Sequence, residues 1–294
     1  MALITEVAFH AQMRKRKIRG YVFYALCLTA VALGLLMLAA LLYNVLSEGF
    51  SRLSWDFITN FPSRFPERAG IHAAILGSIY VVSIAGVVAF SLGVGAAIYL
   101  EEYAKKGTFA SFIQLNIANL AGVPSIVYGI LGLEIFVRIM ELGKSVIAGG
   151  LTLALLVLPI VIIASQEAIR AVPPSLKEGG FALGATKWQV VRRLVLPYAF
   201  PGILTGAILA VSRAVGETAP LIVMGALTFV PFAPDGPMSR FTVLPIQIFN
   251  WVSRPQEGFH VAAAAGIIVL LVVLLTMNAF AVFLRHKFQK GTQW

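Results

Sequence analysis

Long apolar runs dominate this chain and restrict it to folds that lie in a membrane. A transmembrane helix needs about 20 consecutive, mainly apolar residues. Six runs reach that length, at about 20–47, 71–100, 109–138, 145–168, 198–226 and 258–284. Lipid offers no partner for backbone N–H and C=O groups, so such runs form helices, which satisfy these groups internally. The sequence therefore predicts an all-α membrane protein with six transmembrane helices.

The overall composition excludes a soluble protein and argues against a nucleic-acid partner. Hydrophobic residues make up 59% of the chain and charged residues 12%, with a mean hydropathy of +0.87. Soluble domains carry about 25% charged residues. The formal net charge of +10 would suit nucleic acid, but the basic residues lie beside the ends of apolar runs, where they orient a membrane protein. The expected surroundings are therefore a lipid bilayer, without nucleic acid.

The distribution of lysine and arginine predicts the orientation. With the N-terminus in the cytoplasm, 15 of the 23 basic residues fall on the inner side and 7 on the outer side, and Arg213 lies within a span. Cytoplasmic loops are normally the richer in these residues. We predict both termini inside: a basic cytoplasmic N-terminus at 1–19, a six-helix transmembrane domain at 20–284 and a cytoplasmic tail at 285–294.

Two long outer segments, 48–70 and 227–257, connect the spans. The first mixes aromatic residues with charges, which suits the membrane interface or a short amphipathic helix. The second contains five prolines and cannot be one helix, but Phe249 and Trp251 suggest a short interfacial helix. Either segment is a candidate contact for an extracytoplasmic partner, and anchoring at the membrane surface is the alternative.

A basic inner connection at about 169–197 has the signals of two helices joined by a turn. Pro173-Pro174 suits the first turn of a helix, and Gly184 suits the left-handed conformation that ends one. Thr186 is then placed to cap a second helix that runs to Pro197. Such a shape fits a socket on a neighbouring subunit. The alternative is a plain hairpin kept inside by its charges.

The spacing within this connection resembles the docking loop of ABC-importer permeases. That pattern reads E-A-A, three residues, G, nine residues, I-x-L-P. Glu178, Gly184 and the sequence 194–197 fit it, whereas glycines replace both alanines and Leu194 replaces isoleucine. Each glycine weakens a helix by about 0.8–1 kcal/mol relative to alanine. The resemblance implies that Glu178 contacts an ATPase, that Gly184 forms the turn, and that Leu196 and Pro197 complete the motif.

A charged pair lies within the fifth span. Arg213 and Glu217 are four residues apart, which places them on one helix face. An arginine at mid-membrane costs about 2.5–3.5 kcal/mol on insertion scales, so it should face protein or water. Four further residues share the predicted stripe: Gly202, Gly206, Ala210 and Pro220. This geometry fits a pore wall, where the guanidinium would bind an oxyanion. A structural ion pair between two subunits fits equally well.

The third span, 109–138, is a second candidate pore-lining helix. Its Glu134 is an alternative partner for Arg213. Three polar residues, Gln114, Asn116 and Asn119, also lie in this span. Hydrogen bonding between helices is the favoured explanation for these three side chains.

Two further segments resemble the PstA family of phosphate-importer permeases. The sequence 213–221 matches R-x-x-G-E-T-A-P-L, and 122–129 matches G-V-P-S-I-V-Y-G. The resemblance implies a type I ABC importer permease fold in a bacterial or archaeal inner membrane, with phosphate as substrate. It implies a PstC-like second permease, a PstB-like ATPase dimer that binds ATP and Mg²⁺, and a PstS-like phosphate-binding protein outside. Arg213, Glu217, Thr218 and Glu134 are then the candidate residues of the translocation path.

The sequence offers no catalytic or metal site of its own. Gly143-Lys144-Ser145 lacks the leading glycine of a phosphate loop, because Arg138 occupies that position. The four histidines are scattered and have no cysteine or carboxylate at ligand spacing. We therefore expect a non-enzymatic subunit without a cofactor. The remaining alternatives are a permease for another oxyanion, such as sulfate or molybdate, and a self-contained secondary transporter, for which inverted repeats would be evidence.

Overall fold

The computed structural model describes residues 2–105, 107–226 and 229–289, and all of its regular elements are helical. The long helices are α1 (Ala2–Gly49), α3 (His72–Ile98), α6 (Val146–Arg170), α9 (Leu196–Val215) and α12 (Glu257–Gln289). The shorter helices are α2 (Trp55–Thr59), α4 (Thr108–Ala121), α5 (Ser125–Gly132), α7 (Pro174–Ala182), α8 (Lys187–Val190), α10 (Ala219–Met224) and α11 (Leu244–Val252). Short π-helical segments follow α3, α5 and α8, at Tyr99–Tyr103, Leu133–Ile139 and Val191–Val195. The all-helical prediction is confirmed.

Five helices in the described part of the chain are long and apolar enough to cross a membrane. They comprise Arg16–Arg52, His72–Tyr103, Val146–Arg170, Lys187–Val215 and Glu257–Lys287. The predicted end segments are continuous with them: α1 begins at Ala2 and α12 runs to Gln289. Residues 290–294 of the predicted tail lie outside the described residues.

The third predicted span is not one straight helix. Thr108–Ala121 and Ser125–Ile139 meet at an angle of 101°, so the pair is a single broken span or a re-entrant hairpin. Pro124 causes the break, because it has no N–H for the helix ladder and forces the preceding residue out of helical geometry. The Tyr128 hydroxyl donates to the Leu120 carbonyl at 2.8 Å and ties the two arms together.

The fifth predicted span, 198–226, also differs from the structure. Its helix begins earlier, at Lys187, and ends at Val215, where Gly216 forms the C-cap. A separate helix, α10, follows after Thr218 and starts with Ala219-Pro220. Proline suits the first turn of a new helix and disrupts the interior of an existing one. Both PstA-like segments therefore lie at places where a membrane helix is interrupted.

Helices α3, α6 and α9 form the centre of the molecule. A methyl group added to Gly93 of α3 would lie 2.7 Å from the Val161 side chain of α6. Gly202 and Gly206 of α9 pack against Ala168 and Ala164, which also belong to α6. Small residues let the helix backbones approach closely, which is how helices associate in lipid.

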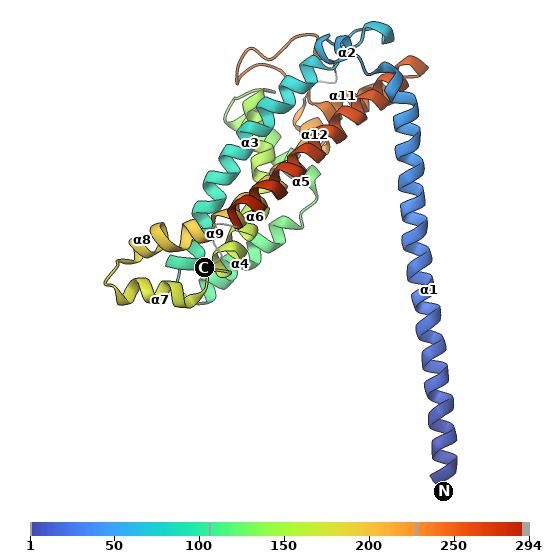
Figure 1. Ribbon diagram of the computed structural model, residues 1–294. Helices are drawn as coiled ribbons and strands as arrows, with labels where there is room; N and C mark the ends of the chain where they lie inside the picture. Colours follow the sequence, from blue (N-terminus) through green and yellow to red (C-terminus); the bar gives the residue numbers. More distant parts are fainter. Residues whose placement is uncertain (1, 106, 227–228, 290–294) are drawn as a thin grey trace.

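Helix α1 stands away from this bundle (Figure 1). Its apolar window is 0% buried, and it meets the rest of the chain at its outer end, where Gly49 packs on Ala264 and Ala265 of α12. The apolar surface of α1 is therefore left for lipid or for neighbouring subunits.

The outer segments fold onto the ends of α3 and α12. Phe57 of α2 and Trp251 of α11 are almost fully buried, and their ring centroids are 5.8 Å apart. The short helix expected around Phe249 and Trp251 is present as α11, but Trp251 does not lie at a lipid interface. It is a core residue, because Phe57 arrives from a segment almost 200 positions earlier in the chain.

Candidate functional site

The inner connection folds into two helices and a glycine turn, as predicted. Pro174 is the first residue of α7, and Gly184 adopts the left-handed conformation with a φ of 77°. Thr186 caps α8 in a capping box: its Oγ1 accepts the Gln189 N–H at 3.4 Å, and Gln189 Oε1 accepts the Thr186 N–H at 2.8 Å. Figure 1 shows α7 and α8 at the end of the bundle opposite to α2.

The second helix of this loop does not stop at Pro197. It continues through Val191–Val195 and α9 as one helix from Lys187 to Val215. The π-helical turn just before Pro197 changes the hydrogen-bond register where the proline N–H is missing, which lets the helix pass the proline. The loop and a membrane span therefore share one continuous helix.

One of the two glycines at 179–180 has a packing role. A methyl group at Gly180 would lie 2.7 Å from Leu194 Cδ1 and 3.1 Å from Val190 Cγ2, whereas Gly179 faces open space. Gly180 thus lets α7 pack closely on the second helix of the loop. The sequence alone identified both glycines only as weak helix formers.

The outward face of the loop combines charge with exposed apolar side chains. Glu178 is exposed on α7, and Leu183, next to Gly184 of the turn, is 89% exposed. Phe181 and Trp188 are also exposed. Sequence reasoning did not single out these three apolar residues, although their presence in a basic turn was a signal. A loop with such a face is suited to an apolar socket with a polar rim.

The two remaining motif residues have different surroundings. Leu196 packs against the apolar cluster that joins the inner ends of α3, α6 and α9. Pro197 is exposed at the start of α9. Leu196 therefore holds the loop to the bundle.

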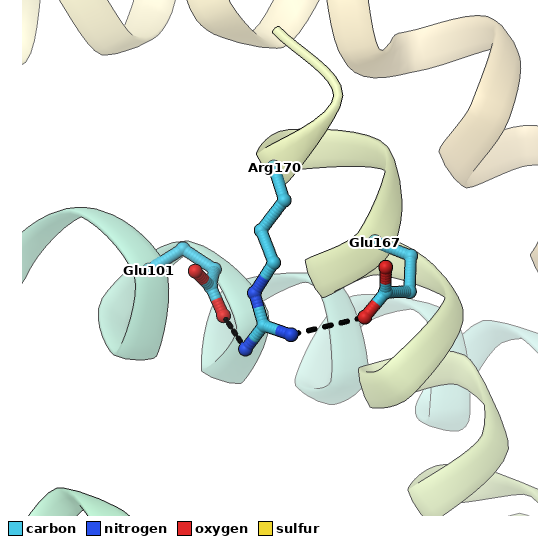
Figure 2. Close-up of polar contacts among 3 residues, drawn as sticks. All are labelled: Glu101, Glu167 and Arg170. Atoms are coloured by element: carbon cyan, nitrogen blue, oxygen red, sulfur yellow. Dashed lines mark hydrogen bonds and ion pairs between the residues drawn. The ribbon is translucent and has the colours of Figure 1, made fainter.

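Ion pairs attach the loop to the inner end of α3. Arg170, the last residue of α6, contacts Glu101 at 2.6 Å and Glu167 at 3.0 Å (Figure 2). Lys177 of α7 contacts Glu102 at 2.5 Å. The Lys187 ammonium of α8 lies 5.1 Å from the centroid of the Tyr103 ring. All three partners on the α3 side belong to its π-helical end, Tyr99–Tyr103.

The Arg213–Glu217 pair forms across the end of a helix. Arg213 Nε is 3.6 Å from Glu217 Oε1, and the side chains are 58% and 17% exposed. Because α9 ends at Val215, Glu217 does not continue its face. The predicted stripe therefore holds only as far as Arg213. Its small residues pack on α6, and the pair lies at the interruption between α9 and α10.

The two PstA-like segments touch each other. Gly129 of α5 and Pro220 of α10 are in such close contact that a methyl group on Gly129 would lie 2.7 Å from the Pro220 Cα. Behind them, Gly132 packs equally closely on Thr152 of α6. Thr218 is half-buried at the N-cap of α10. The two helix interruptions thus form one structural unit.

The polar residues of the third span lie elsewhere. Glu134 pairs with Arg138 at 2.8 Å, both largely exposed, instead of with Arg213. Both residues lie on the π-helical segment that follows α5, at the spacing expected for neighbours. The Asn116 amide donates to the Phe112 carbonyl of its own helix at 2.8 Å, so this bond is not interhelical.

Comparison with known proteins places these features in a family. The family described as the binding-protein-dependent transport system inner membrane component matches residues 89–290. The chain belongs to this family. The matched range begins inside α3 and includes the two-helix loop around Gly184 and both interruptions. Together with the apolar helices, this makes the chain a multi-pass inner-membrane permease.

Two curated relatives match this permease over most of its length. It is 33% identical over 270 residues to the probable ABC transporter permease protein YqgI of Bacillus subtilis, covering 88% of this chain and 91% of the relative. It is 30% identical over 287 residues to the phosphate transport system permease protein PstA 1 of Mycobacterium tuberculosis, covering 96% of this chain and 93% of the relative.

A solved structure confirms the fold. The permease resembles a chain of a bacterial ABC transporter involved in the import of the acidic polysaccharide alginate, with a TM-score of 0.61 at 16% identity. The match covers 96% of this chain and 100% of the other. At this identity the likeness concerns architecture alone, and the architecture is that of a type I ABC importer permease.

Proposed function

We propose that this permease is a PstA-type subunit of an ATP-driven importer of inorganic phosphate and forms half of the translocation pathway. The contact between Gly129 and Pro220 carries the proposal, because it joins both PstA-like segments beside the Arg213–Glu217 pair. The 30% identity to a phosphate transport system permease over nearly the whole chain supports phosphate as the substrate.

The family and the exposed face of the two-helix loop support the following partners. A PstC-like permease completes the pathway, a PstS-like protein delivers phosphate from outside, and a PstB-like ATPase dimer binds ATP and Mg²⁺ inside. This chain is then a non-enzymatic subunit. The ATPase socket receives α7 and the turn at Gly184, with Glu178 and Leu183 as the contact residues. Closure of the ATPase dimer moves the loop, and the spans open toward the binding protein.

Arg213 is suited to contact the anion. An arginine has five donors in a rigid fork, and two parallel donors match phosphate oxygens. The contact with Glu217 uses Nε at 3.6 Å, which is longer than a strong ion pair. The Arg213 side chain is 58% exposed, so part of the guanidinium is accessible to an anion. Glu217 orients the guanidinium and leaves its outer edge for phosphate.

Uptake of labelled phosphate tests this role in cells that lack their own phosphate importers. We expect Arg213→Ala to lower uptake about 10- to 100-fold, since a hydrogen bond to a charged group contributes about 1.5–3 kcal/mol. Arg213→Lys should retain part of the activity, because it keeps the charge. Leu209→Ala, on the exposed side of α9, is the matched control. A normal uptake rate and a normal affinity for phosphate in Arg213→Ala would show that Arg213 has only a packing role. Equal inhibition of labelled-phosphate uptake by sulfate and by unlabelled phosphate would contradict the assignment of phosphate as the substrate.

A further inference from the structure

The inner end of α3 contacts three elements with three consecutive side chains. Glu101 binds Arg170 at the end of α6, Glu102 binds Lys177 of α7, and Tyr103 lies under Lys187 of α8. These residues belong to a π-helical turn, a form that occurs often at functional sites. We call Glu101, Glu102 and Tyr103 the acidic clamp. The clamp contacts both helices of the docking loop: α7, which precedes the Gly184 turn, and α8, which follows it.

The clamp contacts are more strongly held than ordinary surface ion pairs. The Glu101 and Glu102 side chains are only 14% and 10% exposed, and their distances to arginine and lysine are 2.6 and 2.5 Å. Exposed pairs contribute little because water screens them, whereas a partly buried carboxylate that loses its partner remains poorly solvated. By contrast, the Glu167–Arg170 pair at 3.0 Å has a 65% exposed carboxylate.

Apolar packing reinforces the same junction. Ala97 of α3 is fully buried in a cluster with Ile169, Val190 and Val195. The loop and α3 are therefore joined both by ion pairs and by close apolar packing.

At its other end, α3 is attached to the outer segment that precedes α11. The Ser78 hydroxyl accepts the Leu244 N–H at 2.9 Å. Gly77 lies so close to the Thr242 carbonyl that a methyl group at position 77 would be 2.0 Å from its oxygen. One continuous helix of 32 residues, His72–Tyr103, thus links the docking loop to the outer face.

We propose that the acidic clamp makes α3 move with the docking loop, so that α3 carries the ATPase-driven displacement to the outer segment around Thr242–Leu244. Glu102 is the central positioning residue, since it holds the helix that carries Glu178. The inference rests on the proposed function, because it requires an ATPase in the docking site. It adds a route by which the inner and outer ends of the permease are coupled through one rigid element.

The test uses the assembled importer, purified with its ATPase and reconstituted in vesicles. Two rates are measured on each preparation: ATP hydrolysis with saturating phosphate-loaded binding protein, and phosphate entry. The quotient of the two rates, phosphate imported per ATP hydrolysed, measures coupling. A purely structural defect lowers both rates together and leaves this quotient unchanged. We expect Glu102→Gln, which keeps shape and removes charge, to lower this quotient at least fivefold while hydrolysis continues. Glu167→Gln, which removes the exposed partner of Arg170, should leave the quotient within twofold of the original.

Charge exchange adds a second criterion. Glu102→Lys should uncouple the importer, and combining it with Lys177→Glu should restore at least half of the original quotient. An unchanged quotient in both Glu102 variants, or a parallel loss of hydrolysis and transport in Glu102→Gln, would overturn the proposal. These outcomes differ from a failure of the proposed function, in which the unmodified chain would not co-purify with an ATPase or would not import phosphate.

Discussion

Gly129 of α5 lies directly against Pro220 of α10, although the two residues are 91 positions apart in the sequence. The atoms nearest to a methyl group at position 129 are the Pro220 Cα and carbonyl oxygen, both at 2.7 Å, so the obstacle is backbone. Backbone atoms, unlike side-chain atoms, cannot move away by a change of rotamer. The contact therefore fixes how α10 and the Arg213 segment sit against the broken third span.

Gly129→Ala should consequently displace α10. Overpacking in a close-packed region costs about 1–3 kcal/mol. We expect a lower thermal unfolding midpoint for the detergent-solubilised protein and reduced phosphate uptake. Gly95→Ala in α3 is the control, because that position has open space around it. An unchanged midpoint in Gly129→Ala would show that the contact is loose.

The paired glycines of the docking loop should respond differently to alanine. Gly179→Ala meets no neighbouring atom, so it should stabilise α7 by about 0.4–1 kcal/mol through a less flexible unfolded chain. Gly180→Ala must first displace Leu194 and Val190, so it should stabilise α7 less than Gly179→Ala does, or destabilise it. Hydrogen exchange of the α7 amides measures both effects. Equal protection in the two variants would contradict the packing role of Gly180.

Leu183 should anchor the ATPase. The side chain is 89% exposed at the turn, and burying a leucine contributes about 1.5–3 kcal/mol. Leu183→Asp should therefore reduce the ATPase that co-purifies with the tagged permease about tenfold or more, with a normal amount of permease in the membrane. Ser175→Asp is the control, because Ser175 is exposed at the N-terminal end of α7, the end away from the Gly184 turn. Normal ATPase recovery with Leu183→Asp would place the contact elsewhere on the loop.

Glu178→Arg tests the charged part of the same contact. Glu178 is exposed, so the substitution leaves the loop fold intact but reverses the charge offered to the partner. We expect the protein to reach the membrane and phosphate uptake to be lost. Immunoblotting of membranes and labelled uptake measure the two properties. Uptake at the level of the unmodified chain would exclude Glu178 from docking.

The apolar runs and helix signals predicted much of this fold. Five spans and the capped loop follow from composition, from proline at the start of α7, and from Gly184 and Thr186 at the turn. The interruption at Pro124 was not predicted, because 109–138 is mainly apolar and long enough to be one span. Pro220 was taken for a member of a small-residue stripe and Gly216 for the interior of one span, although they mark the start of α10 and the end of α9.

Contacts between residues that are far apart in the chain could not be predicted from a single sequence. Glu102 and Lys177 are 75 positions apart, and neither occupies a motif. Their pairing arises from the packing of α3 beside α6, which no local periodicity encodes. The same holds for Trp251, whose burial depends on Phe57. Glu134 is the opposite case, since its partner Arg138 is a local neighbour at the familiar spacing of four.

The paired helix interruptions have an electrical consequence. At each one, backbone N–H and C=O groups leave the helical ladder at membrane depth, where hydrocarbon cannot solvate them. Such backbone is stable only beside protein or water, so this part of the permease must be hydrated when it faces no neighbour. Water at these positions would shorten the insulating layer, so that the membrane voltage would act mainly on the residues around Gly122–Pro124 and Gly216–Thr218.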